Sequence, residues 1–576
     1  MKLESGNSAP SASDRSSRVR PGRRWTRLGW VFVLVAVAWW LRARGLADLG
    51  LGFNEPIHIY PAMSILETGV PAFPSGVVND RAQLFTYTVA LSFKLFGVNA
   101  WAARLPSLVF NVLTVGLVFL VADRYFGRLT AVLAALMTAF SPFEIVWARA
   151  CRMYSMYQFF FLSAALAFYR GFENGWKQEQ SAPGSRIGNG VGGWLKGGLS
   201  GLSWPWLAAA GALMLVAVHL QPQGLIFGAG VLVYGAVLLG VIYLTQGCGP
   251  ALRSKYFLLV LLGLLGAALI VAVPTLWRKI VELATFMPPW AQLSPRSPTF
   301  YLQFLVRTMF FPILAFFVMG AVQALTRANR FGAFCVVTVA VPLLYHSLIA
   351  RAQSHRYIYD IMPMMFLMAA WGLAEFLASS RERLETGLLA LGVSSQRRVV
   401  LRSSALAAVG LGFALLFYYP LSISLRLPFQ QGGESAGEYN GQWRQACDYI
   451  NTHRREGEVL VVTVPLAAQF HGCLNVDFIL NNGEIDQFRK VDGEDFLLDV
   501  FSNARAVTGL DDLRRVMESH PRGWLALDRQ RFDNPATVPE EVRAMTLTSF
   551  RRHSSGADES IHVFSWDVSR NEGRIQ

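Results

Sequence analysis

Residues 28–41 read LGWVFVLVAVAWWL, a stretch without a single charged side chain. Comparable apolar runs recur along the chain and begin near residues 28, 101, 128, 153, 204, 224, 256, 301, 331, 357 and 403. A helix needs about 20 predominantly apolar residues to cross ~30 Å of hydrocarbon. The pattern therefore predicts an α-helical polytopic membrane protein with about 11 spans.

The composition supports the same fold class. Of the 576 residues, 53% are hydrophobic and only 16% are charged, whereas soluble domains carry roughly a quarter charged residues. The formal net charge of +14 could indicate nucleic-acid binding, but Lys and Arg occur mainly in short loops between apolar runs. Because such loops orient membrane helices, we expect lipid, and no nucleic acid, as the surroundings of this chain.

The chain before the first apolar run is rich in Ser, Pro and Arg. Residues 1–27 are predicted to form a disordered, basic tail on the cytoplasmic side. The run at 28–41 lacks a convincing small-residue cleavage site, and more spans follow it. It is therefore interpreted as a retained anchor rather than a signal peptide.

One apolar segment, residues 84–98, is ambiguous because it is short and carries Lys94. If it does not cross, nearly every basic connecting loop falls on the cytoplasmic side together with the tail, as the positive-inside rule requires. If it crosses, every later loop changes side and the rule fails repeatedly. We therefore expect residues 84–98 to lie at the outer interface as an amphipathic helix within a first outer loop, 47–100.

The sequence changes character after the membrane domain, residues 28–426. Helix and strand patterns alternate over residues 437–576, with a helix near 442–451, strands at 458–463 and 476–480, a helix from Thr508 and a strand at 523–527. This alternation predicts a small α/β domain, which the loop charges place outside the cell membrane. Cys447 and Cys473 lie in it, and either a disulfide or two free buried thiols fits their positions.

With this topology, polar residues collect at the outer ends of the spans, where buried ionisable groups are usually functional. The candidate site residues are Glu55, Asp80, Arg149, Arg152, Tyr154, His219, His355, Arg356 and Tyr357. Arginines can hold a lipid phosphate in bidentate fashion, and a carboxylate can accept a proton from an acceptor. The set suggests group transfer from a phospholipid-like donor. The arginines could instead be headgroup anchors, the tyrosines an aromatic belt and His219 the cap of a span.

Several motifs make the chain resemble a known superfamily. These motifs are FNEP at 53–56, ALSFKLFG at 90–97, ARLPS at 103–107, SPF at 141–143, ARACRMY at 148–154 and HRYIYDIMP at 355–363. Together they resemble the dolichyl-phosphate-mannose protein mannosyltransferases, a superfamily that includes the bacterial aminoarabinose transferases. The resemblance covers residues 28 to about 380. It implies the membrane-integral C-type glycosyltransferase fold, a polyprenyl-phosphate sugar donor and inverting transfer.

Two positions depart from the superfamily pattern. Its first loop usually reads Asp-Glu where this chain has Asn54-Glu55, and its second motif usually has an acid where this chain has Ala150. The catalytic base therefore cannot be carried over directly. Glu55 is the first candidate for the base and Asp80 the second.

The expected function is transfer of a hexose or pentose from a polyprenyl phosphate to an acceptor at the extracytoplasmic face. The acceptor could be a lipid, a glycan or a protein, and the expected location is the plasma (inner) membrane. Arg149, Arg152 and Arg356 would bind the donor phosphate, while Tyr154, His219, His355 and Tyr357 would contact substrates. No cofactor or metal site is predicted, and the need for a divalent metal is left open. The alternatives are a transporter or flippase for lipid-linked sugars and a non-catalytic assembly subunit.

Overall fold

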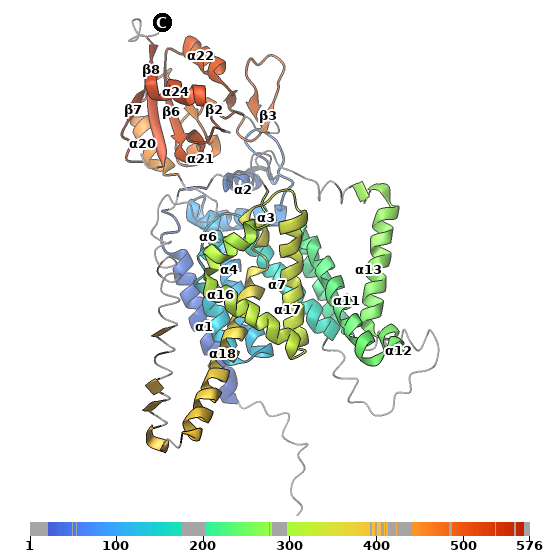
Figure 1. Ribbon diagram of the computed structural model, residues 1–576. Coiled ribbons are helices and arrows are strands. Elements are labelled where there is room, and N and C mark those ends of the chain that lie inside the picture. The colour runs from blue at the N-terminus through green and yellow to red at the C-terminus, as the bar shows by residue number, and fades with distance from the viewer. Residues whose placement is uncertain are drawn as a thin grey trace, which may run out of the picture.

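The computed structural model describes residues 21–173, 202–281, 296–391 and 441–568, apart from short stretches within them, and scattered positions between 394 and 422. Figure 1 shows a bundle of helices with a separate α/β domain at one end, close to α2 and α3. We call this the domain end of the bundle. The predicted tail lies mostly outside the described residues, but its last part is helical. The first helix begins at Pro21, since proline suits the first turn of a helix.

The first half of the bundle comes from residues 21–173. Its helices are α1 (Pro21–Ala43), α2 (Pro56–Thr68), α3 (Gln83–Phe96), α4 (Ala100–Tyr125), α5 (Arg128–Ala139), α6 (Pro142–Ala148) and α7 (Tyr154–Glu173). Asn99 caps α4 by accepting from the Ala102 amide, and Ser141 caps α6 in the same way from Glu144. The Ser141-Pro142 pair bends α5 and α6 by 58° relative to each other.

The second half follows after a gap in the described residues. It contains α10 (Trp204–Leu220), η2 (Pro222–Leu225), α11 (Ile226–Gln246), α12 (Cys248–Leu252), α13 (Lys255–Ala272), α16 (Phe300–Thr326), α17 (Arg330–Leu344), η3 (Tyr345–Ile349), η4 (His355–Ile358) and α18 (Met362–Ala390). Five described helices are long and apolar enough to cross a membrane, or up to seven spans if two bent pairs each count as one. The first ten predicted spans each contain a described helix, whereas the eleventh, from residue 403, lies mostly outside the described residues.

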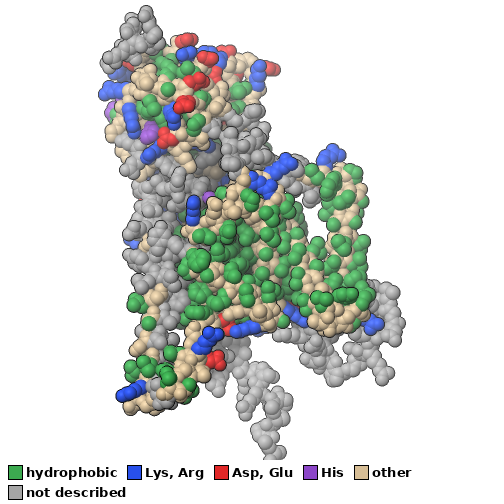
Figure 2. Space-filling view, in the orientation of Figure 1, with side chains coloured by type: hydrophobic (Ala, Val, Ile, Leu, Met, Phe, Trp, Pro, Cys, Tyr) green, Lys and Arg blue, Asp and Glu red, His purple; other side chains and the backbone are tan. Residues whose placement is uncertain are grey.

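The surface of the bundle fits a lipid environment. Figure 2 shows hydrophobic side chains covering its flank, with Lys and Arg gathered towards its two ends. Leu215, Leu244 and Phe311 are more than 70% exposed, which would be costly in water over so wide an area. The polytopic membrane fold expected from the sequence is therefore confirmed.

The ambiguous segment of the first loop forms α3. With 14 residues, this helix is only about 21 Å long, too short to cross the hydrocarbon layer. It packs on α2 and α4 at the domain end of the bundle (Figure 1). Phe85, Val89 and Phe93 are buried on one side, while Leu91 and Leu95 are exposed on the other. This is the arrangement expected for a helix that lies along the interface.

The C-terminal domain is built on an eight-stranded sheet in the order β3-β4-β5-β2-β1-β6-β8-β7. Its strands are β1 (Val459–Val462), β2 (Phe478–Leu480), β3 (Phe488–Arg489), β4 (Leu498–Asp499), β5 (Arg505–Val507), β6 (Arg522–Asp528), β7 (Arg551–His553) and β8 (Ile561–Asp567). The four central strands are parallel, and the outer pairs are antiparallel. Crossover helices are what parallel strands require, so the predicted α/β domain is confirmed.

Its helices are α20 (Trp443–His453), α21 (Pro465–Phe470), α22 (Leu510–Ser519), α23 (Arg529–Phe532) and α24 (Glu540–Ser549). Cys447 on α20 and Cys473 after α21 form a disulfide, which decides between the two alternatives left open by their positions. The domain contacts the first loop directly: Tyr60 Oη donates to the Leu466 carbonyl at 3.0 Å, and the Ser75 amide donates to the Phe501 carbonyl at 3.2 Å.

Candidate functional site

Glu55 lies at the start of α2 and forms a buried ion pair with Arg104 of α4. The Arg104 Nε donates to Oε1 at 2.8 Å and Nη2 donates to Oε2 at 2.7 Å. The amides of Gly52 and Cys151 donate to the same two oxygens at 2.7 and 2.6 Å. Both side chains are at most 1% exposed. Because four donors occupy the carboxylate, Glu55 joins the first loop, α4 and the segment before α7 into one unit.

Arg149 follows α6 and binds the end of α1. Its Nη1 donates to the carbonyls of Arg42 and Arg44 at 2.9 and 2.5 Å, and its Nη2 donates to Gly45 at 3.1 Å. The Arg42 carbonyl belongs to the last turn of α1, where a helix leaves its carbonyls unpaired, and the other two carbonyls lie in the turn that follows. Burial, and secondarily Arg104, lower the pKa of Arg149 to about 10, while Asp48 acts in the opposite direction. This guanidinium thus caps α1.

Arg152 has open hydrogen-bonding capacity, although it is only 6% exposed. Its Nη1 donates to the Asn54 carbonyl at 2.9 Å, and its guanidinium carbon lies 5.6 Å from the centre of the Tyr154 ring. Its Nε makes no hydrogen bond within the described part of the chain. The same holds for Nε1 of Trp147, whose ring lies 4.7 Å from that of Tyr154. Two buried donors that have no acceptor among the described residues therefore lie close to Tyr154.

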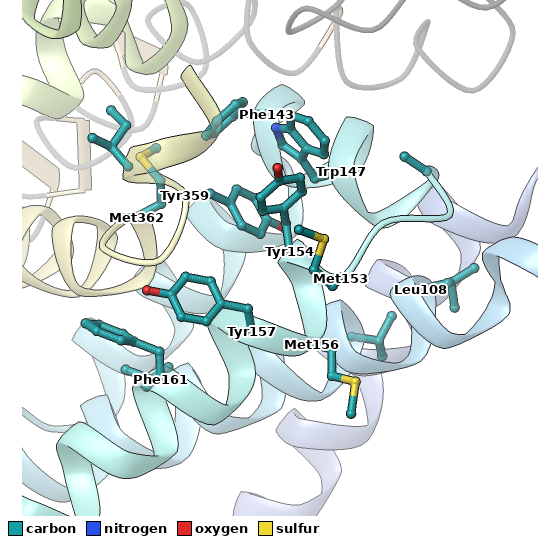
Figure 3. Close-up of a cluster of buried hydrophobic side chains, with 14 of the residues drawn as sticks. Leu108, Phe143, Trp147, Met153, Tyr154, Met156, Tyr157, Phe161, Tyr359 and Met362 are labelled. Atoms are coloured by element: carbon teal, nitrogen blue, oxygen red, sulfur yellow. The ribbon is translucent and has the colours of Figure 1, made fainter. Parts of the chain in front are cut away.

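Figure 3 shows Trp147, Tyr154, Tyr359 and Phe143 gathered at the start of α7. The buried Glu144, which follows Phe143 on α6, accepts from Asn111 Nδ2 at 2.7 Å and from Gln158 Nε2 at 2.9 Å. Asn111 Nδ2 also lies 2.7 Å from the Tyr359 hydroxyl. Buried polar groups need such partners. These bonds join α4, α6 and α7 to Tyr359 next to the aromatic side chains.

Tyr357 brings a second group of cations to Tyr154. Burial raises the pKa of Tyr357, the nearby hydroxyl of Tyr154 adds to this effect, and the charges of Arg356 and of Arg81 in the first loop oppose it. The Arg356 guanidinium carbon lies 5.5 Å from the centre of the Tyr357 ring. Arg152 with Tyr154 and Arg356 with Tyr357 are thus two neighbouring cation–ring pairs, and all four residues were predicted from the sequence. Asp80 precedes Arg81 and is exposed.

The two predicted histidines are held by other parts of the bundle. His219 lies at the end of α10, where its Nε2 accepts from the Leu84 amide of α3 at 3.3 Å. His355 is stacked between Phe300 and Phe304 of α16, with ring centres 4.7 and 4.2 Å away. The described contacts of both side chains are thus with α3 and α16, not with Arg152 or Arg356. Their predicted substrate contacts stay predictions.

Three residues outside the predicted set contribute to this site: Arg104, Arg81 and Trp147. Arg104 is part of the ARLPS motif and Arg81 adjoins Asp80, so the sequence carried a signal for both. Trp147 has only its position beside Arg149 to suggest a role. Over the part of the chain that the structure describes, no three His, Cys, Asp or Glu side chains cluster closely enough to hold a metal ion.

Comparison with known proteins agrees with this architecture. Residues 80–190 match the family model described as dolichyl-phosphate-mannose-protein mannosyltransferase. A search of curated proteins finds no significant match.

Solved structures cover nearly the whole chain. The apo structure of ArnT from Cupriavidus metallidurans has a TM-score of 0.55 at 16% identity and covers 94% of this chain and 99% of that one. The same protein bound to undecaprenyl phosphate has a TM-score of 0.53 at 15% identity, over 93% and 98% of the chains. The oligosaccharyltransferase AglB from Archaeoglobus fulgidus, in complex with an inhibitory peptide and a dolichol-phosphate, has a TM-score of 0.55 at 12% identity, over 93% and 74%. The chain thus has the fold of the membrane-integral C-type glycosyltransferases and, over residues 80–190, resembles the dolichyl-phosphate-mannose-protein mannosyltransferases.

Proposed function

We propose that the protein is a glycosyltransferase that moves a sugar from a polyprenyl-phosphate donor to an acceptor at the extracytoplasmic face of the membrane. The fold supports this proposal, since ArnT and AglB are described with undecaprenyl phosphate and with dolichol-phosphate. The transfer would be inverting, with a hexose or a pentose as the sugar. A lipid, a glycan or a protein would be the acceptor.

The observation that carries the proposal is a pair of buried hydrogen-bond donors beside Tyr154 that have no described acceptor. Arg152 Nε and Trp147 Nε1 are buried and have no described acceptor, although leaving a buried donor unpaired costs about 1–3 kcal/mol. A bound ligand that supplied the acceptor would remove this cost. Arg152 and Arg356 lie near the rings of Tyr154 and Tyr357, the charge of Arg81 acts on Tyr357, and a phosphate offers both the oxygens and the negative charge that this group lacks.

The reaction would then proceed by one displacement. An acceptor oxygen or nitrogen attacks the anomeric carbon, the bond from that carbon to the phosphate oxygen breaks, and the polyprenyl phosphate leaves with the bonding electrons. Arg152 and Arg356 would stabilise the charge on the leaving phosphate. The acceptor proton passes to a carboxylate. Asp80 is exposed beside Arg81 and can receive it, whereas Glu55 would first have to release Arg104.

In this proposal Arg149 acts indirectly. Its guanidinium donates to one carbonyl in the last turn of α1 and to two in the turn that follows, so it would hold the chain that leads into the first loop while Arg152 binds the phosphate. Glu55 would have a corresponding positioning role through Arg104.

The proposed orientation of the chain in the membrane rests on the charge of the loops and on the disulfide. Basic loops at the end of the bundle opposite the C-terminal domain favour that end as cytoplasmic. The Cys447–Cys473 disulfide is typical of an oxidising compartment. Both observations support a cytoplasmic N-terminus, an extracytoplasmic C-terminal domain and a location in the plasma (inner) membrane.

The test is transfer from radiolabelled polyprenyl-phosphate sugars to membrane acceptors by the purified full-length protein. Arg152→Ala should lower transfer about 100-fold, the usual effect of removing one donor that stabilises developing charge. Arg383→Ala, on the exposed surface of α18, is the matched control and should transfer at the wild-type rate.

Two results would overturn the proposal. Equal transfer by Arg152→Ala and the wild type would remove this arginine from the site. If the wild type consumed no donor but moved lipid-linked sugar across liposomes, the protein would be a transporter.

A further inference from the structure

The C-terminal domain reaches the site through a short segment, residues 465–473, which we call the α21 segment. It leaves the end of β1 and lies against the first loop at the domain end of the bundle (Figure 1). The Leu466 carbonyl accepts from Tyr60 Oη at 3.0 Å. At its other end, Nε2 of His471 accepts from the Leu51 amide at 3.3 Å.

Leu51 belongs to the turn that leads into Glu55. Arg104 holds this turn from below, because its Nη1 and Nη2 donate to the carbonyls of Leu46 and Gly50 at 2.8 and 2.7 Å. His471 contacts the turn from the C-terminal domain, and it lies close enough to Arg104 and Glu55 for their charges to act on it. The turn is therefore held between the bundle and the C-terminal domain.

The same turn connects directly to the candidate phosphate ligand. The carbonyl of Asn54 accepts from Arg152 Nη1 at 2.9 Å, so a displacement of residues 51–55 would also displace this guanidinium. A change of about 1 Å in the position of a catalytic contact can lower rates substantially. The path from His471 to Arg152 passes through only one short turn of the backbone.

The α21 segment is itself fixed to its domain. The disulfide Cys447–Cys473 joins its end to α20. Asn451 of α20 donates to the Gly472 carbonyl at 2.7 Å and accepts from the Leu474 amide at 3.3 Å. These bonds lie on either side of Cys473 and directly follow His471, the residue of the segment that contacts the first loop.

We propose that His471 is a positioning residue contributed by the C-terminal domain: held by the Cys447–Cys473 disulfide, it fixes the Leu51–Glu55 turn and thereby the guanidinium of Arg152. This inference rests on the proposed function for its effect on transfer, but the contact itself does not depend on it. The domain then serves as part of the site rather than as a separate module.

Hydrogen exchange of the full-length protein in lipid nanodiscs tests the contact without any transfer assay. In His471→Ala, exchange of peptides covering residues 46–60 should rise about two- to tenfold, the factor that corresponds to one lost hydrogen bond. His471→Gln, whose amide oxygen can accept from Leu51, should restore slow exchange. His453→Ala, an exposed histidine of α20, is the control and should leave these peptides unchanged.

The double variant Cys447→Ser/Cys473→Ser tests the role of the disulfide. Exchange should rise in residues 466–474 and in residues 46–60 together. A rise confined to residues 466–474 would show that the disulfide does not act on the turn. Unchanged exchange of residues 46–60 in His471→Ala would overturn the proposal. A rise that also covered β1 and β6 would overturn it too, because His471 would then maintain the domain fold.

Transfer provides the second readout. His471→Ala should lower turnover two- to tenfold without changing the melting temperature, and His471→Gln should recover it. If the wild type shows no transfer, the proposed function fails while the exchange result still decides the contact. If the wild type is active and His471→Ala keeps full turnover despite faster exchange, the turn does not position Arg152.

Discussion

Two buried glutamates, Glu55 and Glu173, occupy opposite ends of the bundle and differ in what surrounds them. Glu173 ends α7 and accepts from Tyr234 at 3.0 Å and from Tyr256 at 2.9 Å, and it pairs with Lys255 at 3.3 Å. All these partners are side chains from α11 and α13. Glu55 instead pairs with one arginine and two backbone amides.

The polar groups around the two glutamates differ in how completely they are paired. Around Glu173 a carboxylate, an ammonium group and two hydroxyls satisfy one another, as expected of a structural cluster that joins helices. Near Glu55, Arg152 Nε and Trp147 Nε1 have no described acceptor. The two neighbourhoods therefore differ in how completely their polar groups are paired, and the one near Glu55 belongs to the proposed site.

The largest expected loss of stability comes from breaking the Glu55–Arg104 ion pair at the domain end. Arg104→Ala leaves the Glu55 carboxylate buried with only two amides, and removing one partner of a buried ion pair costs about 3–5 kcal/mol. We expect a strong drop in the melting temperature in detergent and loss of transfer. Arg124→Ala, exposed on the same helix, is the control. An unchanged melting temperature for Arg104→Ala would mean that Glu55 finds another partner.

A smaller effect is expected at the Glu173 cluster. Tyr234→Phe removes one hydrogen bond to a charged group, worth about 1.5–3 kcal/mol. The melting temperature should fall while transfer per folded molecule stays at the wild-type level, because this cluster lies at the far end from Arg152. Tyr243→Phe, exposed on the same helix, should change neither quantity. Loss of specific activity in folded Tyr234→Phe would contradict the separation of roles.

The smallest expected effect is the dependence of hydrogen exchange on pH around His471 at the domain end. Burial, followed by the charges of Arg104 and Arg444, lowers the pKa of His471 from its ordinary 6.5 to about 4, against the opposite effect of Glu55. Folding thus disfavours the proton, so the contact with Leu51 is fully stabilising above pH 6.5 and is lost as the pH falls through about 4. Exchange of residues 46–60, corrected for its intrinsic pH dependence, should rise several-fold over this range. His471→Gln should show no such rise; an identical rise in both proteins would assign the titration to another group.

Local patterns predicted much of the fold. Apolar length predicted the first ten helical segments, loop charge predicted that α3 does not cross, and alternation predicted the C-terminal sheet. These features depend on properties of contiguous residues, such as hydrophobicity and the period of a helix or a strand. The same reasoning located Arg152, Tyr154, Arg356 and Tyr357 in loops at one end of the bundle.

The pairing of these side chains could not be predicted in the same way. Glu55 and Arg104 are separated by 49 positions in the chain, and nothing in either motif indicates that they bind each other. Arg149 and Arg152 are close in sequence and appeared equivalent, yet one caps α1 and the other faces Tyr154. A difference of three residues after α6 directs their side chains to different neighbours.

The sequence by itself therefore determined that this protein crosses the membrane, that its polar loops gather at one end, and that an α/β domain follows. Tertiary structure alone decided which buried charges have a partner and which hydrogen-bond donors have no described acceptor. It also decided that His471, more than 400 residues away, contacts Leu51. The physical reason is that hydrophobic burial follows from local composition, whereas a hydrogen bond requires two groups within about 3 Å, and only the packing of the helices and the domain brings them there.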